Sequence, residues 1–289
     1  MANIKELKVR ISSTKSTLKI TSAMKLVSAA KLSKAQNKIQ SLKPYSNELD
    51  STIRTASALA ENYSHEFLNE GESNRTALLV ISSNKGLCGG YNSQLYKKVK
   101  HFLSDKKENT DLFFVGRKVK ELLQRDGIAA EKNYVFEKAD PRYEEIVAVV
   151  NELTELFTSG KYGKVFIAFN SFVSAIEFIP TIKPILPFSI SAEEKEELVK
   201  EFPVDFKYEP SAEAILDSLI PEVLVMTVYA SLLDAIAAEH ASRMTAMDNA
   251  TNNSKDMIRT LTLTMNKLRQ AAITTELTEI VSGAESLNG

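Results

Sequence analysis

The string of residues most able to do chemistry is SSNKGLCGGYN, residues 82–92, a glycine-rich turn between a β-like run and a helical run. A turn of this kind can present backbone N–H groups to a phosphate at the start of a helix. The string lacks both the Lys-Ser/Thr ending of a P-loop and the GxGxxG spacing of a dinucleotide site. We therefore interpret it as a tight strand-to-helix turn rather than a nucleotide site.

Few residues of the sequence could act as a nucleophile or bind a metal. The single cysteine, Cys88, could act as a nucleophile, but the three histidines lie in unrelated segments with no motif-like partner: His65, His101 and His240. One cysteine and three scattered histidines also give no metal-ligand spacing. The sequence therefore predicts a small buried thiol and no catalytic residue, metal or cofactor on this chain. The acidic run within 193–197 is interpreted as the solvated first turn of a helix.

Size and composition restrict the class of protein. The chain has 289 residues, of which 44% are hydrophobic and 25% charged, and at about 150 residues per unit this predicts roughly two structural units. The composition excludes disorder and collagen. No run reaches the ~18 consecutive apolar residues of a membrane span, and polar residues and prolines interrupt the longest candidate, 168–187. Any membrane association is therefore expected to be peripheral, and the lone cysteine favours a reducing compartment.

Glycine and proline, which are costly inside helices, are nearly absent from both ends of the chain. Nothing breaks residues 1–43, which leaves room for a helix of roughly 65 Å, or residues 222–282, which leaves room for roughly 90 Å. We predict one long helix over 1–62 and a second over 211–287. Pro44 is expected to bend or interrupt the first helix.

Steps of three and four along both helices predict coiled-coil seams. The seam of the first helix contains one charged residue, Lys25, and the seam of the second changes face near Met244. Residues 239–255 are small and polar, so apolar burial cannot be all that fixes this stretch. Because the chain leaves along one helix and returns along the other, we predict an antiparallel pair whose apolar C-terminal tip, residues 271–287, projects beyond the N-terminus and requires a covering partner.

Between the helices the pattern has the periods of strands and short helices. The β-like runs cover 76–82, 111–115 and 165–169, and the helical runs cover 93–105, 117–125 and 143–157. This alternation predicts a Rossmann-like α/β domain over 75–190, with a mainly parallel sheet covered by helices. The proline-rich segment 175–188 suits the edge of that sheet. The expected fold class is therefore α/β, with the domain inserted between the two coiled-coil helices.

The N-terminal segment is the basic part of a chain whose net charge is −1. Residues 1–43 contain ten Lys/Arg and a single acid, Glu6. Such a face fits an acidic partner, nucleic acid or an anionic membrane surface, although the segment has no aromatic residue on which bases could stack. A transit peptide has a similar composition, but the heptad seam starting at Ile4 favours a mature structural helix. A solvated lysine face on a helical bundle remains an alternative.

Three parts of the sequence resemble the γ subunit of bacterial F-type ATP synthases. They are KITSAMKLVSAAKLSKAQ (19–36), GLCGGYN (86–92), and ASRMTAMDNAT with NKLRQAAITTELTEIVSGA (241–251 and 266–284). The similarity extends over essentially the whole chain. Ser-Asn-Lys at 83–85 departs from the Thr/Ser-Asp-Arg run common in the family, and the cysteine-bearing insertion of the redox-regulated chloroplast type is missing.

The resemblance implies a central-stalk rotor. The coiled coil would stand inside three α and three β subunits of F1, and the α/β domain would rest with the ε subunit on the c-ring of Fo. Rotation would couple proton flow to ATP synthesis or hydrolysis in the β subunits, with no catalysis on this chain. The implied location is the cytoplasmic side of the cell membrane, as a peripheral protein that reaches the membrane only through Fo. No nucleic acid is implied as a partner.

By resemblance, two groups of residues contact the β subunit. Met24, Lys25 and Lys31, with Arg243 nearby, would face its mobile acidic loop. A second group would meet β-subunit loops higher on the shaft: Arg269, Gln270, Thr274 and Glu276. Two other functions stay open, a coiled-coil scaffold or tether without ATP synthase partners, and an α/β enzyme that binds a phosphorylated ligand at 86–90.

Overall fold

A computed structural model describes residues 2–59, 65–69, 71–104, 109–136, 141–188 and 211–288, together with the isolated positions 196, 198, 200 and 209. The acidic run within 193–197 lies outside the described residues, apart from position 196. The chain separates into two compact units. Unit 1 comprises residues 1–29 and 243–289, and unit 2 comprises residues 30–242.

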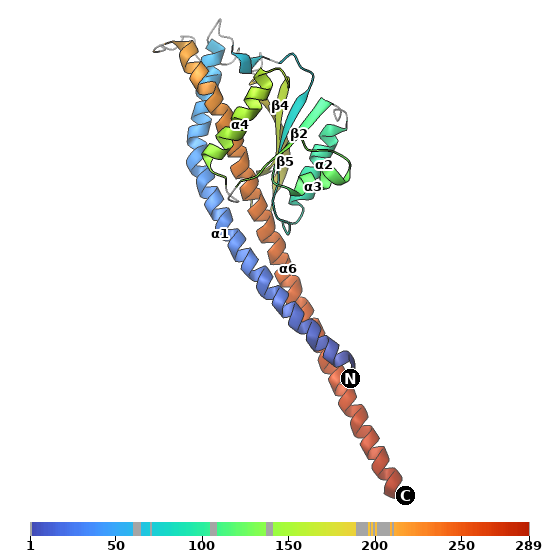
Figure 1. Ribbon diagram of the computed structural model, residues 1–289. Coiled ribbons are helices and arrows are strands. Elements are labelled where there is room, and N and C mark those ends of the chain that lie inside the picture. The colour runs from blue at the N-terminus through green and yellow to red at the C-terminus, as the bar shows by residue number, and fades with distance from the viewer. Residues whose placement is uncertain are drawn as a thin grey trace. The chain divides into compact units, whose positions relative to one another are not determined.

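The two long helices are confirmed. Helix α1 spans Ala2–Leu59 and α6 spans Ala212–Asn288, and each contributes to both units (Figure 1). Pro44 was expected to bend or interrupt the first helix, and it does not interrupt it, because α1 continues through Pro44 as α6 continues through Pro221. A proline inside a helix costs about 3 kcal/mol. In unit 2 the turns that follow Pro44 are buried in the core through Leu49 and Ile53, and this packing offsets the local cost.

Unit 2 contains a five-stranded sheet. Its strands are β1 (Thr76–Ile81), β2 (Thr110–Val115), β3 (Lys132–Tyr134), β4 (Lys164–Phe172) and β5 (Phe178–Leu186), in the order β3-β2-β1-β4-β5. The pairs among β3, β2, β1 and β4 are parallel, and β5 is an antiparallel edge strand. The mainly parallel sheet and the proline-bearing edge are therefore confirmed. The sequence interpretation missed β3, which is too short to show a period.

Helices cover both faces of this sheet. They are α2 (Tyr91–Leu103), α3 (Lys118–Arg125) and α4 (Tyr143–Thr158), preceded by a short 3-10 turn, Glu66–Leu68. One face, which carries Leu79 and Phe113, packs with α4 and with the unit 2 parts of α1 and α6. The opposite face, which carries Leu78 and Phe114, packs with α2 and α3 (Figure 1). Because both faces are buried, the strands read as continuous apolar runs.

Unit 1 is an antiparallel helix pair. Its register is given by three contacts between side chains, Thr14 with Met257, Thr21 with Thr251 and Lys25 with Asp248. Continuing this register places Arg243 about opposite Ala29, roughly five residues beyond Met24 along α1. It also carries α6 past the start of α1 from about residue 270, so the predicted projection of the C-terminal tip is confirmed within unit 1 (Figure 1).

Helix α6 also contains the most membrane-like window among the described residues. An 18-residue window within Ala212–Ala284 has mean hydropathy 1.7, long and apolar enough to cross a membrane by length and composition alone, and 56% of it is buried inside the molecule. The sequence interpretation had placed the longest candidate at 168–187, which instead forms parts of β4 and β5. A core helix passes the same test of length and hydropathy, and the buried residues of α6 in unit 2 fit that explanation.

Candidate functional site

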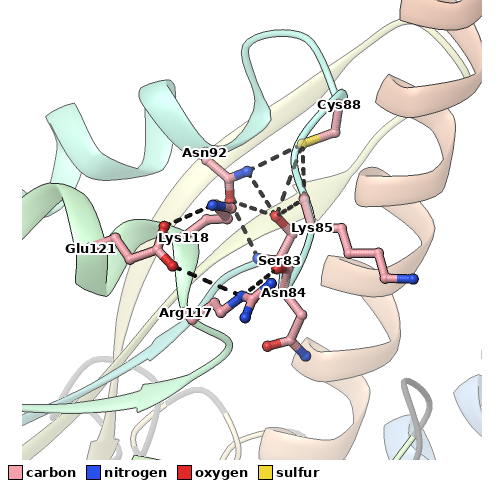
Figure 2. A network of polar contacts seen from close by, with 8 residues as sticks. All are labelled: Ser83, Asn84, Lys85, Cys88, Asn92, Arg117, Lys118 and Glu121. Carbon is pink, nitrogen blue, oxygen red and sulfur yellow. Dashed lines mark hydrogen bonds and ion pairs between the residues drawn. The ribbon is translucent and has the colours of Figure 1, made fainter.

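The glycine-rich turn after β1 closes on itself through polar contacts (Figure 2). The Ser83 hydroxyl donates to the Lys85 carbonyl at 2.7 Å and accepts from the Asn92 side-chain nitrogen, also at 2.7 Å. Asn92 Oδ1 accepts from the Ser83 backbone N–H at 3.3 Å, and Asn92 Nδ2 lies 3.2 Å from the Sγ of Cys88. Cys88 is buried, as predicted for a structural thiol.

A second set of contacts ties this turn to the end of β2. Arg117 Nε donates to the Asn84 carbonyl at 2.9 Å, and Lys118 donates its backbone N–H to the Ser83 carbonyl at 3.0 Å (Figure 2). Gly116 has a φ of +88°, and a Cβ there would lie 2.0 Å from the Ser82 carbonyl oxygen. Only glycine therefore allows the two strand ends to approach this closely.

The same turn is anchored on α6 inside unit 2. The Tyr91 hydroxyl donates to the Ala235 carbonyl at 3.0 Å, and the Ser242 hydroxyl donates to the Cys88 carbonyl at 2.6 Å. The side-chain hydroxyls of Ser83 and Tyr91 and the side-chain amide of Asn92 are thus used within the protein. This geometry supports a structural strand-to-helix turn that fixes the domain to α6.

A pocket of about 520 Å³ in unit 2 gathers ionisable groups between α1, α6 and the β4–β5 hairpin. Burial lowers the pKa of Lys183, whose ammonium lies 5.3 Å from the centre of the Phe169 ring. Burial raises the pKa of Asp234, although the Ser171 hydroxyl donates to its carboxylate at 3.1 Å and lowers that pKa in part. The pocket contains no histidine or cysteine, and no group of three metal ligands occurs anywhere among the described residues.

The first group of predicted partner contacts lies mostly in unit 1. Met24 and Lys25 are half-buried on α1, and Arg243 is buried on α6, 8% exposed. The ammonium of Lys25 lies 2.6 Å from an Asp248 carboxylate oxygen. Lys31 is exposed on the part of α1 that belongs to unit 2.

The second group lies where α6 runs past α1. All four of its members are exposed: Arg269, Gln270, Thr274 and Glu276. The Thr274 hydroxyl donates to the Gln270 carbonyl of the preceding turn at 3.0 Å. The apolar side chains of the same stretch are exposed too, among them Ile273, Leu277, Ile280 and Val281. An apolar helix end left open in this way is typical of a surface that a partner covers.

Sequence reasoning named Lys25 but missed its partner, Asp248. A signal was present, since Lys25 is the one charged residue in the first seam and an acid lies in the small polar stretch of the second helix. The register between the two helices, which only the structure provides, brings the two residues together.

Comparison with known proteins places the chain in a family. The family described as ATP synthase matches residues 3–287. The ATP synthase gamma chain of Lachnoclostridium phytofermentans is 40% identical over 293 residues, and that of Bdellovibrio bacteriovorus is 41% identical over 296 residues, each covering 100% of both chains. The chain belongs to the ATP synthase gamma chain family. The family resemblance read from the sequence is therefore confirmed.

Solved structures of ATP synthases share the gamma chain fold. A chain in the Euglena gracilis mitochondrial ATP synthase, OSCP/F1/c-ring in rotational state 3, aligns with a TM-score of 0.66 at 17% identity and covers 99% of this chain and 95% of its own. The rotor of the same synthase in rotational state 1 aligns with a TM-score of 0.62 at 17% identity, covering 94% of this chain and 99% of its own. At this identity the likeness shows the fold. The gamma chain is a non-catalytic subunit, which agrees with a turn at 82–92 that is occupied by structural contacts.

Proposed function

We propose that this chain is the central-stalk rotor of an F-type ATP synthase. Its membership of the gamma chain family over residues 3–287 carries this proposal. The helix pair of unit 1 supports it, because the apolar end of α6 is exposed in the chain by itself and would be covered inside a ring of partner subunits.

The proposed action is mechanical. A shaft whose sides differ presents a different surface to each surrounding β subunit and so favours a different open or closed state in each. Nucleotide binding and release in the β subunits are then coupled to the orientation of the shaft, and the coupling acts in both directions. The chain itself contributes stiffness and asymmetry, while the bond-breaking residues belong to the β subunits.

Two surfaces are proposed to meet the β subunits. Near the middle of the shaft, Met24, Lys31 and Arg243 supply one contact, and the neighbouring Leu26 and Val27 are strongly exposed apolar side chains of α1. Near the tip the contact is supplied by Arg269, Gln270, Thr274 and Glu276. Lys25 is proposed at the first surface as well, and its ammonium also contacts Asp248 on α6.

The proposed assembly contains three α and three β subunits, the ε subunit and the c-ring of Fo. The chain would be a peripheral protein on the cytoplasmic side of the cell membrane, reaching the bilayer through Fo. Proton flow through Fo is the proposed driving force.

Purification of the native complex tests the proposal against a coiled-coil scaffold. With an affinity tag on the exposed surface of unit 2, α, β, ε and c subunits are expected to copurify with ATP hydrolysis activity. Membrane vesicles that contain the complex are expected to acidify on addition of ATP. A stable complex with neither hydrolysis nor ATP synthase subunits would favour the scaffold instead.

A further inference from the structure

Polar contacts join the two helices of unit 1 at mid-shaft. The hydroxyls of Thr21 and Thr251 lie 2.8 Å apart, and both residues are buried. Each hydroxyl also contacts a carbonyl of its own helix, Leu18 at 3.2 Å and Met247 at 2.7 Å, so the ion pair between Lys25 and Asp248 carries most of the register argument. One turn along α1, the Lys25 ammonium lies 2.6 Å from Asp248 Oδ1. Leucine side chains can repack after one helix slips along another, whereas a directional polar contact is satisfied in one register only. The cluster Thr21, Lys25, Asp248 and Thr251, named here the polar clasp, therefore specifies how the helices are aligned.

The ammonium of Lys25 is directed toward α6, because it lies 2.6 Å from Asp248 Oδ1. The two residues that follow it, Leu26 and Val27, are 70% and 57% exposed, so the outward surface beside Lys25 is apolar. The side chains of Lys25 and Asp248 are 41% and 43% exposed. The two charges can therefore be exchanged by mutation without disturbing a buried core.

We propose that Lys25 is a positioning residue that acts through Asp248. The polar clasp holds α1 and α6 in one register, and this register sets the relative heights of Met24 and Arg243 on the shaft. The proposal rests on the proposed rotor function, since a slipping pair of helices would present the β subunits with a changing surface. A role of Lys25 through direct contact with the β subunit is the competing explanation.

Exchanging the two charges separates these explanations. Lys25→Asp places two carboxylates opposite each other, and Asp248→Lys places two ammonium groups there. The double variant, Lys25→Asp with Asp248→Lys, restores an ion pair of reversed direction. Lys19→Asp is the matched control, because Lys19 is an exposed lysine of α1 in unit 1 and makes the same change of charge.

The register is measured on the full chain without partners, so this arm does not depend on the rotor function. Spin labels at Lys15→Cys and Lys255→Cys, both exposed and one on each helix, report the distance between the helices in a Cys88→Ser background. We expect one narrow distance distribution for the parent and for Lys19→Asp. Each single reversal should broaden or split it, and the double variant should restore one narrow peak.

The ratio of ATP-driven proton pumping to ATP hydrolysis is measured with the assembled complex in vesicles. Exposed ion pairs shift equilibria by a factor of roughly two to five, so we expect each single reversal to lower this ratio by about that factor. The double variant should recover most of the loss, and Lys19→Asp should lose nothing.

Two results would overturn the proposal. If the double variant restores the distance distribution but pumps no better than Lys25→Asp alone, then the charge of Lys25 is needed by the partner and not by Asp248. If the single reversals leave the distance distribution narrow and unchanged, then the polar clasp does not set the register. Failure of the rotor function itself would be recognised separately, because the parent complex would then not pump at all.

Discussion

The two units of this chain differ in how far they bury their apolar side chains. In unit 2, Leu78, Leu79 and Val80 on β1 have no exposed surface, and helices cover both faces of their sheet. In unit 1 the buried positions include threonine and serine, and the large apolar side chains toward the C-terminus of α6 are exposed. Unit 2 therefore buries its apolar side chains within the chain itself. In unit 1, polar contacts align the two helices, and part of the apolar surface stays exposed. This difference fits the proposed rotor, in which partner subunits would cover the apolar end of α6.

The largest effect is expected from shortening the tip. Deleting residues 273–289 removes Leu277, Ile280 and Val281, each worth roughly 1.5 to 3 kcal/mol if fully buried by partners. Assembly with α and β subunits should fail or weaken strongly, while the thermal stability of the isolated chain should hardly change, because these side chains are exposed. Deleting only 286–289 is the control and should leave assembly largely intact. Equal sensitivity to both deletions would show that the tip is not seated in a partner.

A single substitution in the sheet should have the next largest effect. Leu79→Ala leaves a cavity in a site with no exposed surface and should lower the free energy of unfolding by about 2 to 5 kcal/mol. Thr21→Val, the comparison in the seam of unit 1, keeps the shape of the side chain but removes a hydroxyl that contacts Thr251 and the Leu18 carbonyl, and should cost about 1 to 2 kcal/mol. Urea titrations of both variants measure the difference. Equal losses would remove the contrast between a packed core and a polar seam.

Met24→Lys tests whether the mid-shaft surface of unit 1 couples ATP hydrolysis to proton pumping. A lysine there adds a cation beside the surface proposed to meet acidic side chains of the β subunit, and a charge-assisted contact of roughly 1.5 to 3 kcal/mol would have to be broken at every step of rotation. ATP hydrolysis should persist while proton pumping falls disproportionately, and Arg243→Cys should restore part of the coupling. Val9→Lys is the matched control on an exposed position of α1. An unchanged ratio in Met24→Lys would place this residue outside the coupling surface.

The smallest effect is expected in the pocket of unit 2. Burial raises the pKa of Asp234 above its ordinary value, so protonation of this carboxyl stabilises the folded state. That stabilisation is lost as pH rises through the folded-state pKa. Asp234→Asn has no such charge to bury. Its stability relative to the parent should therefore increase slightly from about pH 4 to about pH 7, as measured by urea unfolding at each pH. A relative stability that falls over this range would mean that Lys183 and Lys43 outweigh the burial.

The parts of this architecture that depend on local sequence could be predicted. The parts that depend on contacts between distant residues could not. The long helices follow from the scarcity of glycine and proline at both ends of the chain, and the order of strands and helices in unit 2 follows from their periods. Pro44 does not interrupt α1, one of its two predicted effects, because the rule for proline is local, while Leu49 and Ile53 hold the following turns in a core assembled from distant strands. Strand β3 has only three residues, too few for a period to show.

The candidate contacts show the same limit. The turn at 82–92 was predicted as structural from its spacing, and the contacts of Ser83 and Asn92 explain why. Lys25 and Asp248 are 223 positions apart in the chain, and their pairing depends on the register between two helices, which no local pattern encodes. The contacts of Arg269, Gln270, Thr274 and Glu276 depend on surfaces of other subunits and stay predictions.

Single-molecule rotation tests the central claim most directly. The α and β subunits are fixed to a surface, and a bead is attached to the chain through a cysteine at Lys161, an exposed residue of unit 2, in a Cys88→Ser background. The account predicts that the bead turns in one direction, in steps, on addition of ATP, and stops when the nucleotide is removed. A bead that stays still while the same complexes hydrolyse ATP would contradict the claim that this chain is the rotor.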